Sequence, residues 1–516
     1  MTVSSMIRRG GASMNRISGL LIAAMLAGFA QLVWSQPAPL EKNLFLYAER
    51  IPLLDGTFAQ AERGFIYVPV KRSEPKSGLI AVEVYRFRAS ASQRPPTPPV
   101  FLLYGGPSFQ GLGGPLETRG FYEENIRPYL EIGDLVVVGQ RGIGSSKPTT
   151  LIEDPKPFPL DAEVSQEQAS AALRDACVRG KAFWEARGLN LSGFTIIEAA
   201  EDVNDVRKAL GYEKITLWGG SFGSHWGMAI MRYHPEIVER AILRGMEGPD
   251  HTYDMPTQVL NALSRIAASA EQSPALKGMV PEGGLIEALK TVIARLKEKP
   301  VTVTIKDPST GLMEKVTFTA RDVREMALGY TASVASRNGM RTWPADILAL
   351  YSGDFSKAAA SVIQRRHSPV HQTASFFMLD CASGISPKRA AQLRSDPAVE
   401  ILGPLGWEYQ AGCPVWQIDL GDQFRQNFTT NIPTLIVLGT FDVSTPMENA
   451  LELAPFFKNS RLVQIIGGSH NSLQDGLDAS EDFRKAVVKF ARTGDMSDLP
   501  KEVTLPQVQW VVPSNK

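Results

Sequence analysis

One glycine-rich turn constrains the fold of this chain more than any other stretch of its sequence. Residues 215–218 (ITLW) form an apolar run of strand length, residues 219–223 read Gly-Gly-Ser-Phe-Gly, and residues 224–233 have a helical pattern. A strand, a sharp turn and a helix with G-x-S-x-G at the turn form the context of a nucleophile elbow. Glycine tolerates the crowded backbone there and leaves the hydroxyl of Ser221 exposed above the sheet. The sequence therefore predicts a nucleophilic Ser221, with an ordinary glycine-rich turn as the alternative.

The segments on both sides of this turn alternate between strands and helices. Runs of strand length occur at residues 64–70, 79–88, 100–104, 135–138, 240–244, 434–438 and 461–466. Helical patterns occur at residues 166–188, at 196–210 behind Thr195 as a cap, and at 480–492. This order predicts an α/β protein with a mostly parallel central sheet and helices on both faces.

The chain is longer than one ordinary core, so an insertion or a second domain is expected. The alternation stops between residues 248 and 423, where the pattern is mainly helical, and we interpret this stretch as a cap inserted into the core. The predicted organisation is a signal peptide (1–35), an N-terminal part of the α/β core (36–247), the cap (248–423), a C-terminal part of the core (424–492) and a tail (493–516).

A serine nucleophile needs a histidine base, and the base needs a carboxylate that orients it. Most histidines fall on the helix after the turn or in the cap, namely His225, His234, His251, His367 and His371. His470 instead directly follows a strand, and Asp442 directly follows the strand before it. The carboxyl ends of parallel strands lie at one edge of the sheet, so Ser221, Asp442 and His470 are expected to meet there. A turn aspartate and a loop histidine without a catalytic role are the alternatives.

The loops after two other buried strands face the same edge. Residues 105–108 (GGPS) follow the strand at 100–104, and their glycines let backbone N–H groups approach a ligand. We expect the amides of Gly106 and Phe222 to form an oxyanion hole, with a flexible loop as the alternative. In the loop after residue 138, Arg141 is interpreted as scaffold bonded to carbonyls or to a carboxylate.

The N-terminus has the pattern of a targeting segment. Arg8, Arg9 and Arg16 precede an almost uncharged apolar run at residues 17–33, which a proline-containing stretch then breaks. This is typical of a secretory signal peptide, and an uncleaved membrane anchor is the alternative. We therefore expect an exported protein, periplasmic or secreted, without a stable membrane partner if the signal is cleaved.

Composition limits the partners and cofactors. The formal net charge is zero and no basic block could follow a phosphate backbone, so a nucleic-acid partner is not expected. No spacing resembles a metal site, and no metal or other cofactor is expected. Cys381 and Cys413 lie in the same region and are expected to form a disulfide, which leaves Cys177 free or paired between chains.

The motifs at the strand ends resemble those of the α/β-hydrolase superfamily: GGSFGS at residues 219–224, GTFDVSTP at 439–446 and GGSH at 467–470. Two further motifs are similar to those of its proline iminopeptidase and tripeptidyl aminopeptidase branch, YGGP at 104–107 and QRGIGS at 140–145. The resemblance extends from about residue 64 to residue 492 and is weakest across the cap. The chain departs from the branch at Tyr104, Ser108 and Gln140, where histidine, glycine and aspartate are usual.

The resemblance implies an exported serine hydrolase, in the first place an aminopeptidase that releases N-terminal residues or short peptides. It also implies carboxylates that receive the free amine of the peptide, for which Glu247 and Asp250 at the cap entrance are the candidates. A hinge salt bridge is the alternative role for these two residues. A secreted carboxylesterase that acts on small esters would need the same triad and no amine-binding carboxylate. A non-catalytic binding module is the third possibility, and it would need none of the three triad residues.

Overall fold

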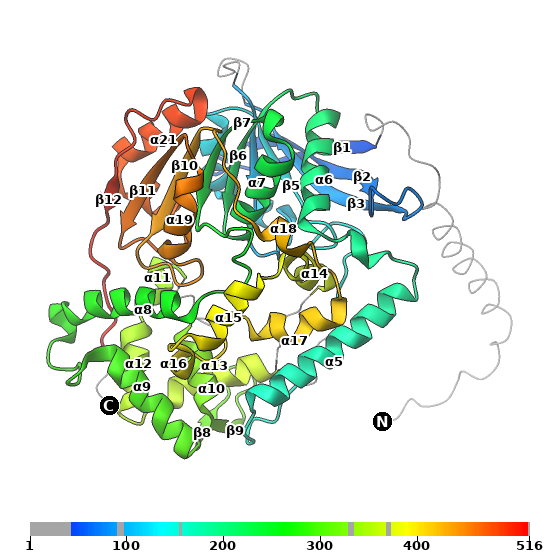
Figure 1. Ribbon diagram of the computed structural model, residues 1–516. Helices are drawn as coiled ribbons and strands as arrows, with labels where there is room; N and C mark the ends of the chain where they lie inside the picture. The colour runs from blue at the N-terminus through cyan, green and yellow to red at the C-terminus, as the bar shows by residue number, and fades with distance from the viewer. Residues whose placement is uncertain (1–42, 90–96, 154–156, 329–334, 368–372, 514–516) are drawn as a thin grey trace, which may run out of the picture.

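The computed structural model describes residues 43–89, 97–153, 157–328, 335–367 and 373–513. Within these residues ten strands form one sheet, which occupies the upper part of the molecule in Figure 1. Its order is β1 (Leu44–Pro52), β2 (Phe58–Pro69), β3 (Leu79–Phe87), β5 (Leu135–Val138), β4 (Val100–Leu103), β6 (Ile215–Gly220), β7 (Val238–Arg244), β10 (Thr434–Gly439), β11 (Ser460–Ile466) and β12 (Glu502–Thr504).

The strands from β5 to β12 in this order pair in parallel, whereas β1, β2, β3 and β5 pair antiparallel. Strands β4, β6 and β10 are buried along their whole length, because helices cover both faces of the sheet. The predicted α/β class with a mostly parallel sheet is therefore confirmed. The sequence patterns missed β1 and β12, and the three residues of β12 are too few to show any periodicity.

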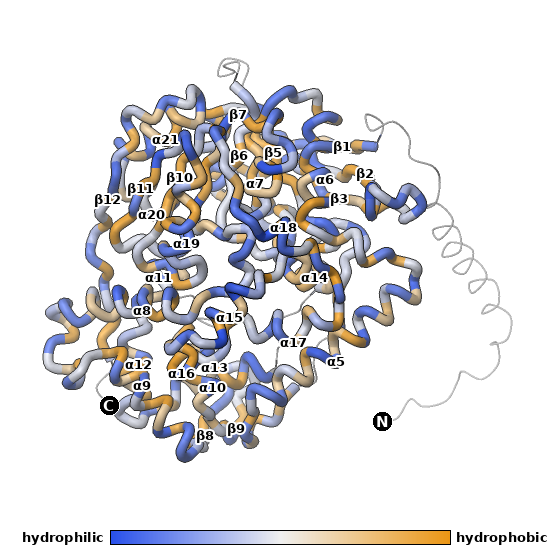
Figure 2. The backbone as a smooth tube through the Cα atoms, in the orientation of Figure 1, coloured by the Kyte–Doolittle hydropathy of each residue, from blue (hydrophilic) through white to orange (hydrophobic). Residues whose placement is uncertain are grey.

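Helices pack on both faces of this sheet. They are α2 (Gly113–Leu116), α3 (Phe121–Asn125), α4 (Arg127–Leu130), α6 (Ile196–Ala209), α7 (Phe222–Tyr233), α19 (Met447–Leu453), α20 (Ser472–Ala479) and α21 (Glu481–Thr493). Helix α5 (Gln166–Glu185) instead packs mainly on α14 (Ala374–Ser383) and α17 (Trp407–Trp416) of the predicted cap. The buried Val203 of α6 and Trp226 of α7 pack on one face, and the buried Phe483 and Phe490 of α21 pack on the other. Figure 2 shows hydrophobic residues concentrated along β5, β6 and α7 in the interior.

A mainly helical region lies below the sheet in Figure 1 and joins β7 to β10. It contains α8 (Pro256–Glu271), α9 (Gly284–Glu298), the hairpin β8 (Val301–Lys306) and β9 (Met313–Phe318), α10 (Ala320–Ala327), α11 (Arg337–Met340), α12 (Trp343–Tyr351), α13 (Ser356–His367), α14 (Ala374–Ser383), α15 (Pro387–Ser395), α16 (Val399–Leu402), α17 (Trp407–Trp416) and α18 (Gly421–Arg425). Leu263 and Ile347 belong to an apolar cluster of this region that is distinct from the clusters on the sheet faces. Leu160 and Trp510 pack into the same cluster from outside the predicted cap, and the domain boundaries stay predictions.

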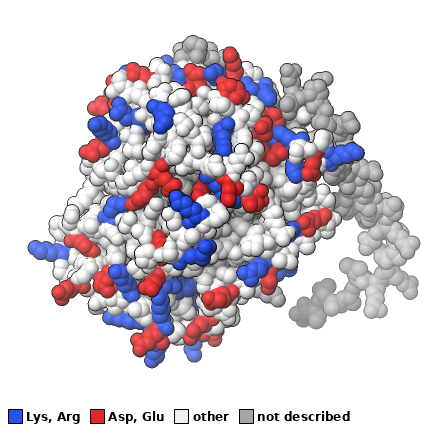
Figure 3. Space-filling model, viewed as in Figure 1, with Lys and Arg blue, Asp and Glu red and all other residues white. Residues whose placement is uncertain are grey.

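The predicted signal peptide, residues 1–35, lies outside the described residues. Of the helices that the structure describes, none is both long enough and apolar enough to cross a membrane. On the face seen in Figure 3, acidic and basic side chains are interspersed, in keeping with a formal net charge of zero.

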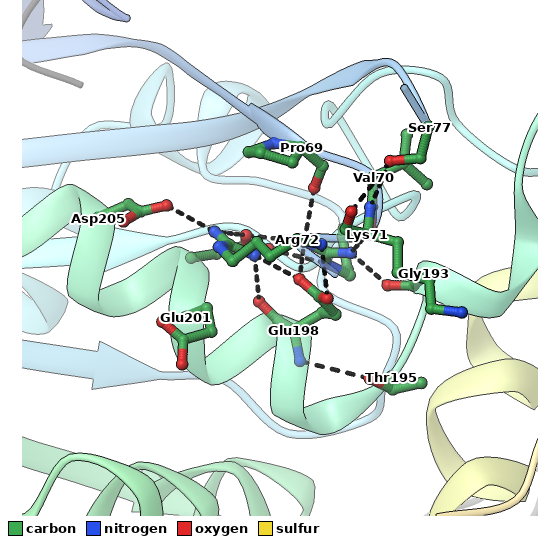
Figure 4. Close-up of polar contacts among 12 residues, drawn as sticks. Pro69, Val70, Lys71, Arg72, Ser77, Gly193, Thr195, Glu198, Glu201 and Asp205 are labelled. Atoms are coloured by element: carbon green, nitrogen blue, oxygen red, sulfur yellow. Dashed lines mark hydrogen bonds and ion pairs between the residues drawn. The ribbon is translucent and has the colours of Figure 1, made fainter. Parts of the chain in front are cut away.

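A buried ion cluster ties the loop after β5 to α6, and Figure 4 shows its members Arg72, Glu198 and Asp205. The fully buried Arg141 donates two hydrogen bonds of 2.8 Å to the carboxylate of Asp202 and further bonds to backbone carbonyls. Arg72 donates to Asp202 at 2.8 Å and to Glu198 and Asp205 at 2.6 Å. Burial alone would raise the pKa of Asp202, but Arg141 and Arg72 lower it below its ordinary value. These contacts match the scaffold role predicted for Arg141.

Candidate active site

The turn between β6 and α7 has the geometry of a nucleophile elbow. Ser221 has φ 56° and ψ −133°, a conformation that residues other than glycine rarely adopt. A Cβ at Gly219 would lie 2.3 Å from the carbonyl oxygen of Gly223, and a Cβ at Gly223 would lie 2.1 Å from that of Leu103. Only glycine fits at both positions, as the G-x-S-x-G motif requires. The turn thus places a strained Ser221 at the carboxyl edge of the sheet.

Asp442 and His470 follow β10 and β11 and bind each other. His470 Nδ1 lies 3.0 Å from each carboxylate oxygen of Asp442. Thr445 Oγ1 donates to Asp442 Oδ2 at 2.8 Å, and the amides of Ser444 and Thr445 donate to Oδ1 at 2.9 and 3.0 Å. Burial would raise the pKa of Asp442, but the His470 ring and these hydrogen bonds lower it below its ordinary value. Asp442 is therefore held ionised, and it fixes the orientation of the imidazole.

Gly245, just beyond β7, borders both Ser221 and His470. Its carbonyl oxygen accepts a hydrogen bond of 3.1 Å from the amide of Ser221, and a Cβ on it would lie 3.2 Å from His470 Cε1. Among the residues that the structure describes, none forms a hydrogen bond with Ser221 Oγ. Catalytic hydrogen bonds are often long without substrate and tighten when it binds. The structure brings the three predicted triad residues to one edge, each beyond a parallel strand.

The two predicted oxyanion donors border Ser221. Phe222 is the first residue of α7, so its amide has no acceptor within the helix. A Cβ at Gly105 would lie 3.1 Å from the Cβ of Ser221, so the loop after β4 passes directly beside the nucleophile. The next residue in this loop, Gly106, has φ 118°, a conformation that favours glycine. The arrangement can hold an oxyanion between two backbone amides, and the role of Gly106 and Phe222 stays a prediction.

Gln140 holds this loop in place. Its Nε2 donates to the carbonyl oxygens of Tyr104 and Gly105 at 3.0 and 3.1 Å, and its Oε1 accepts from the amide of Phe109 at 3.1 Å. An ionised aspartate offers only acceptors and could not bind the two carbonyls, whereas an amide offers donors and an acceptor. Glutamine at position 140, where the branch usually has aspartate, therefore holds the loop after β4 in place. The carboxylate partner of Arg141 is Asp202 on α6.

Of the two predicted amine-binding residues, Glu247 borders the elbow and Asp250 does not. The amide of Glu247 donates to Ser224 Oγ at 2.9 Å, and this hydroxyl donates to the carbonyl oxygen of Ser221 at 2.7 Å. Asp250 accepts from the amide and the hydroxyl of Ser386 at 2.5 and 2.6 Å, at the start of α15. Its carboxylate is thus engaged in a structural contact between the first residues of the predicted cap and the start of α15.

Two carboxylates that the sequence patterns do not single out lie close to Glu247. They are Asp254, in the loop before α8, and Asp380 on α14. Asp380 is 2% exposed; its Oδ2 accepts a hydrogen bond of 2.5 Å from the Tyr409 hydroxyl, and its Oδ1 has no partner. Burial raises the pKa of Asp380 to about 8 and that of Asp254 to about 7. Burial, and then the charges of Asp380 and Asp254, raise the pKa of Glu247 well above its ordinary value.

A disulfide between Cys381 and Cys413 joins α14 to α17. Asp380 directly precedes one cysteine, and Tyr409 lies about one helical turn before the other. The crosslink therefore holds the hydrogen-bonded pair of Asp380 and Tyr409 together. Cys177 is a buried free thiol. Within the described ranges, no group of three or more histidine, cysteine and acidic side chains is arranged to hold a metal ion.

Comparisons with known proteins agree with this geometry. The family profile of the alpha/beta hydrolase fold matches residues 98–276, and that of TAP-like proteins matches residues 402–502. The first range contains the elbow and the loop after β4, and the second contains Asp442 and His470.

Three named relatives are peptidases. The chain is 28% identical over 171 residues to a proline iminopeptidase of Neisseria meningitidis, which is 33% of this chain and 40% of that protein. It is 24% identical over 195 residues to a tripeptidyl aminopeptidase of Streptomyces lividans, covering 36% and 35% of the two chains. It is 27% identical over 193 residues to the serine protease Hip1 of Mycobacterium bovis, covering 36% of each. Each match spans 40% or less of the relative's own length. The chain therefore has the α/β-hydrolase fold, and its matched segments are similar to the peptidases of the proline iminopeptidase and tripeptidyl aminopeptidase branch.

Proposed function

We propose that this protein is an exported serine hydrolase that transfers an acyl group from its substrate to water. His470 takes the proton of Ser221 while Oγ attacks the substrate carbonyl, and Asp442 stabilises the imidazolium that forms. The amides of Phe222 and Gly106 bind the oxyanion, and each contributes roughly 3 kcal/mol to lowering the barrier. His470 then protonates the leaving group. In the second half of the reaction His470 takes a proton from water, the water attacks the acyl-enzyme carbonyl, and His470 returns the proton to Ser221 Oγ as the acid is released.

We further propose that the substrates are peptides with a free N-terminus, so that the enzyme is an aminopeptidase. The observation that carries this proposal is the unpaired Oδ1 of Asp380, buried beside Glu247. Within the described chain, Asp254, Glu247 and Asp380 form no ion pair with a cation. An ammonium group would supply both the missing positive charge and the missing hydrogen-bond donor.

The position of Glu247 supports the same substrate class. Its backbone is connected to Ser221 through the single hydroxyl of Ser224. We infer that the carboxylate of this residue receives the amine of a substrate residue whose own carbonyl is attacked. A small ester without an amine would leave the acidic cluster unpaired, so the carboxylesterase possibility has no feature of the site in its favour.

Labelling and a substrate panel test the two levels of the proposal separately. Wild-type protein is expected to react with a fluorophosphonate probe at Ser221, and Ser221→Ala is expected to abolish this labelling. Labelling that persists at another serine contradicts the triad, and a wild-type protein that reacts with no serine-directed probe favours a binding module.

Amino-acid and peptide anilides with a free amine are then compared with their N-acetyl forms and with short acyl esters. The aminopeptidase proposal predicts that N-acetylation abolishes turnover and that Asp380→Asn and Glu247→Gln raise KM for free-amine substrates. Turnover of esters without turnover of any anilide would instead support the carboxylesterase. N-terminal sequencing of protein collected outside the cytoplasm tests export and locates the signal cut.

A further inference from the structure

The last residue of β7, Arg244, contacts both the nucleophile and the base. Its backbone carbonyl accepts a hydrogen bond of 3.2 Å from the amide of Ser221, and its Nη1 donates a hydrogen bond of 2.6 Å to the carbonyl oxygen of His470. The two residues of the triad that exchange a proton are therefore both attached to this one residue.

The side chain of Arg244 passes directly beside Gly220, the residue before the nucleophile. Gly220 pairs with Arg244 across β6 and β7, and a Cβ at Gly220 would lie 2.7 Å from both Cζ and Nε of the guanidinium. The glycine that precedes the nucleophile thus serves a second purpose, because it leaves room for Arg244 to reach the loop of His470.

The environment of the Arg244 guanidinium disfavours its charged form. Burial lowers the pKa of Arg244 below its ordinary value, although Asp442, Tyr129 and Asp475 act against this effect. In the described part of the chain none of these groups is close enough to form a direct ion pair with it. A half-buried charge without a direct counter-ion adds little to stability, which favours a functional reason for its presence.

We propose that Arg244 is a positioning residue that fixes the distance between Ser221 and His470. Its backbone carbonyl fixes the position of Ser221 by accepting the hydrogen bond of the Ser221 amide. Its guanidinium fixes the position of the loop that carries His470 by donating to the carbonyl oxygen of His470. The proposal rests on the triad proposed above. It does not depend on the substrate class, because Arg244 contacts Ser221 and His470 and not the substrate.

Arg240 provides a matched control on the same strand. It lies on the same face of β7, is 6% exposed, and donates to the carbonyl oxygens of Ala491 and Arg492 at 2.8 and 3.2 Å. These carbonyls end α21, at the opposite end of the strand from the site. Arg240 is buried and Arg244 is half-buried; both guanidinium groups bind backbone carbonyls, and of the two only Arg244 reaches the triad.

The test measures the second-order rate of fluorophosphonate labelling of Ser221. Arg244→Met keeps the apolar volume under Gly220 and removes the donor, and we expect labelling to slow by about 10- to 100-fold, as misplacement of catalytic groups does. The rates on anilide and ester substrates are expected to fall by the same factor. Arg244→Lys, which keeps a donor, is expected to retain more activity than Arg244→Met.

Chemical rescue separates positioning from folding. Arg244→Ala leaves a cavity of guanidinium shape, and millimolar guanidinium is expected to restore part of the labelling rate. The same addition to Arg240→Ala is expected to leave its labelling rate unchanged. If Arg244→Ala does not fold, the labelling rates of Arg244→Met and Arg244→Lys are compared instead, and a faster rate for Arg244→Lys supports the positioning role. A folded Arg244→Met that is labelled at the wild-type rate overturns the inference, whereas a wild-type protein that is never labelled overturns the proposed function itself.

Discussion

Replacing Asp380 by asparagine is expected to make this protein more stable and less active. The carboxylate is 2% exposed, its Oδ1 has no hydrogen-bond partner, and burial raises its pKa to about 8. Asparagine has nearly the same shape, and its oxygen can still accept the hydrogen bond of the Tyr409 hydroxyl. The variant therefore removes the charge and leaves the packing of α14 on α17 unchanged.

The size of the effect follows from the two pKa values. An aspartate whose pKa rises from 3.8 to about 8 on folding has to take up a proton in order to fold at neutral pH. Each pKa unit corresponds to about 1.4 kcal/mol, so the destabilisation at pH 7 has an upper bound of about 4 kcal/mol. Between the two pKa values the folded state binds more protons than the unfolded state, so this contribution makes wild-type stability fall as pH rises. The advantage of Asp380→Asn should thus be small near pH 4 and largest near pH 8.

Urea unfolding of both proteins between pH 5 and pH 8 measures the advantage directly. Asp396→Asn is the matched control, because Asp396 is also buried in the cap but accepts from Thr257 Oγ1 at 2.6 Å and from the amides of Thr257 and Ala398 at 3.0 and 2.9 Å. Asparagine keeps one of the two acceptor oxygens and replaces the other by a donor, so the loss of the hydrogen bonds to that second oxygen should destabilise the control across this pH range. An Asp380→Asn variant whose advantage does not grow with pH would refute the reasoning, and so would one that keeps the wild-type KM for free-amine peptides.

Three further changes test other parts of the structure. Gly223→Ala would place its Cβ 2.1 Å from a backbone oxygen of β4 and should prevent formation of the elbow, whereas Gly114→Ala, with open space around it, should be tolerated in thermal unfolding and labelling assays. Gln140→Leu leaves two carbonyls and an amide unpaired and should lower kcat on every substrate while costing about 1–3 kcal/mol of stability, measured by urea unfolding. The double variant Cys381→Ser, Cys413→Ser should lose roughly 3–4 kcal/mol of stability by the chain-entropy estimate for its loop and should raise KM for free-amine peptides, which steady-state kinetics measures.

The residues that follow parallel strands could be predicted because their signals are local. Ser221, Asp442 and His470 each stand directly after an apolar run, and the sheet brings such positions together whatever their separation in sequence. Asp380 and Tyr409 carry no such signal, since they lie on two cap helices whose relative position depends on tertiary packing and on a disulfide. The place of Asp250 in the chain predicts an amine-binding carboxylate, whereas in the structure this carboxylate accepts hydrogen bonds from Ser386.

Two buried carboxylates elsewhere in this protein, which support the fold, differ from Asp380 in having a cationic partner. Asp202 is as deeply buried as Asp380, yet it receives both Arg141 and Arg72, and its pKa stays below the ordinary value. The buried carboxylate of Glu83 likewise pairs with Arg63 at 3.0 Å. Cations thus pair directly with carboxylates that only support the fold. Among the described residues Glu247, Asp254 and Asp380 form no ion pair, although the charge of Arg389 acts on Asp254. This contrast within one molecule supports the proposal that the substrate supplies the cation, because a structural cluster left unpaired would only lower the stability of the fold.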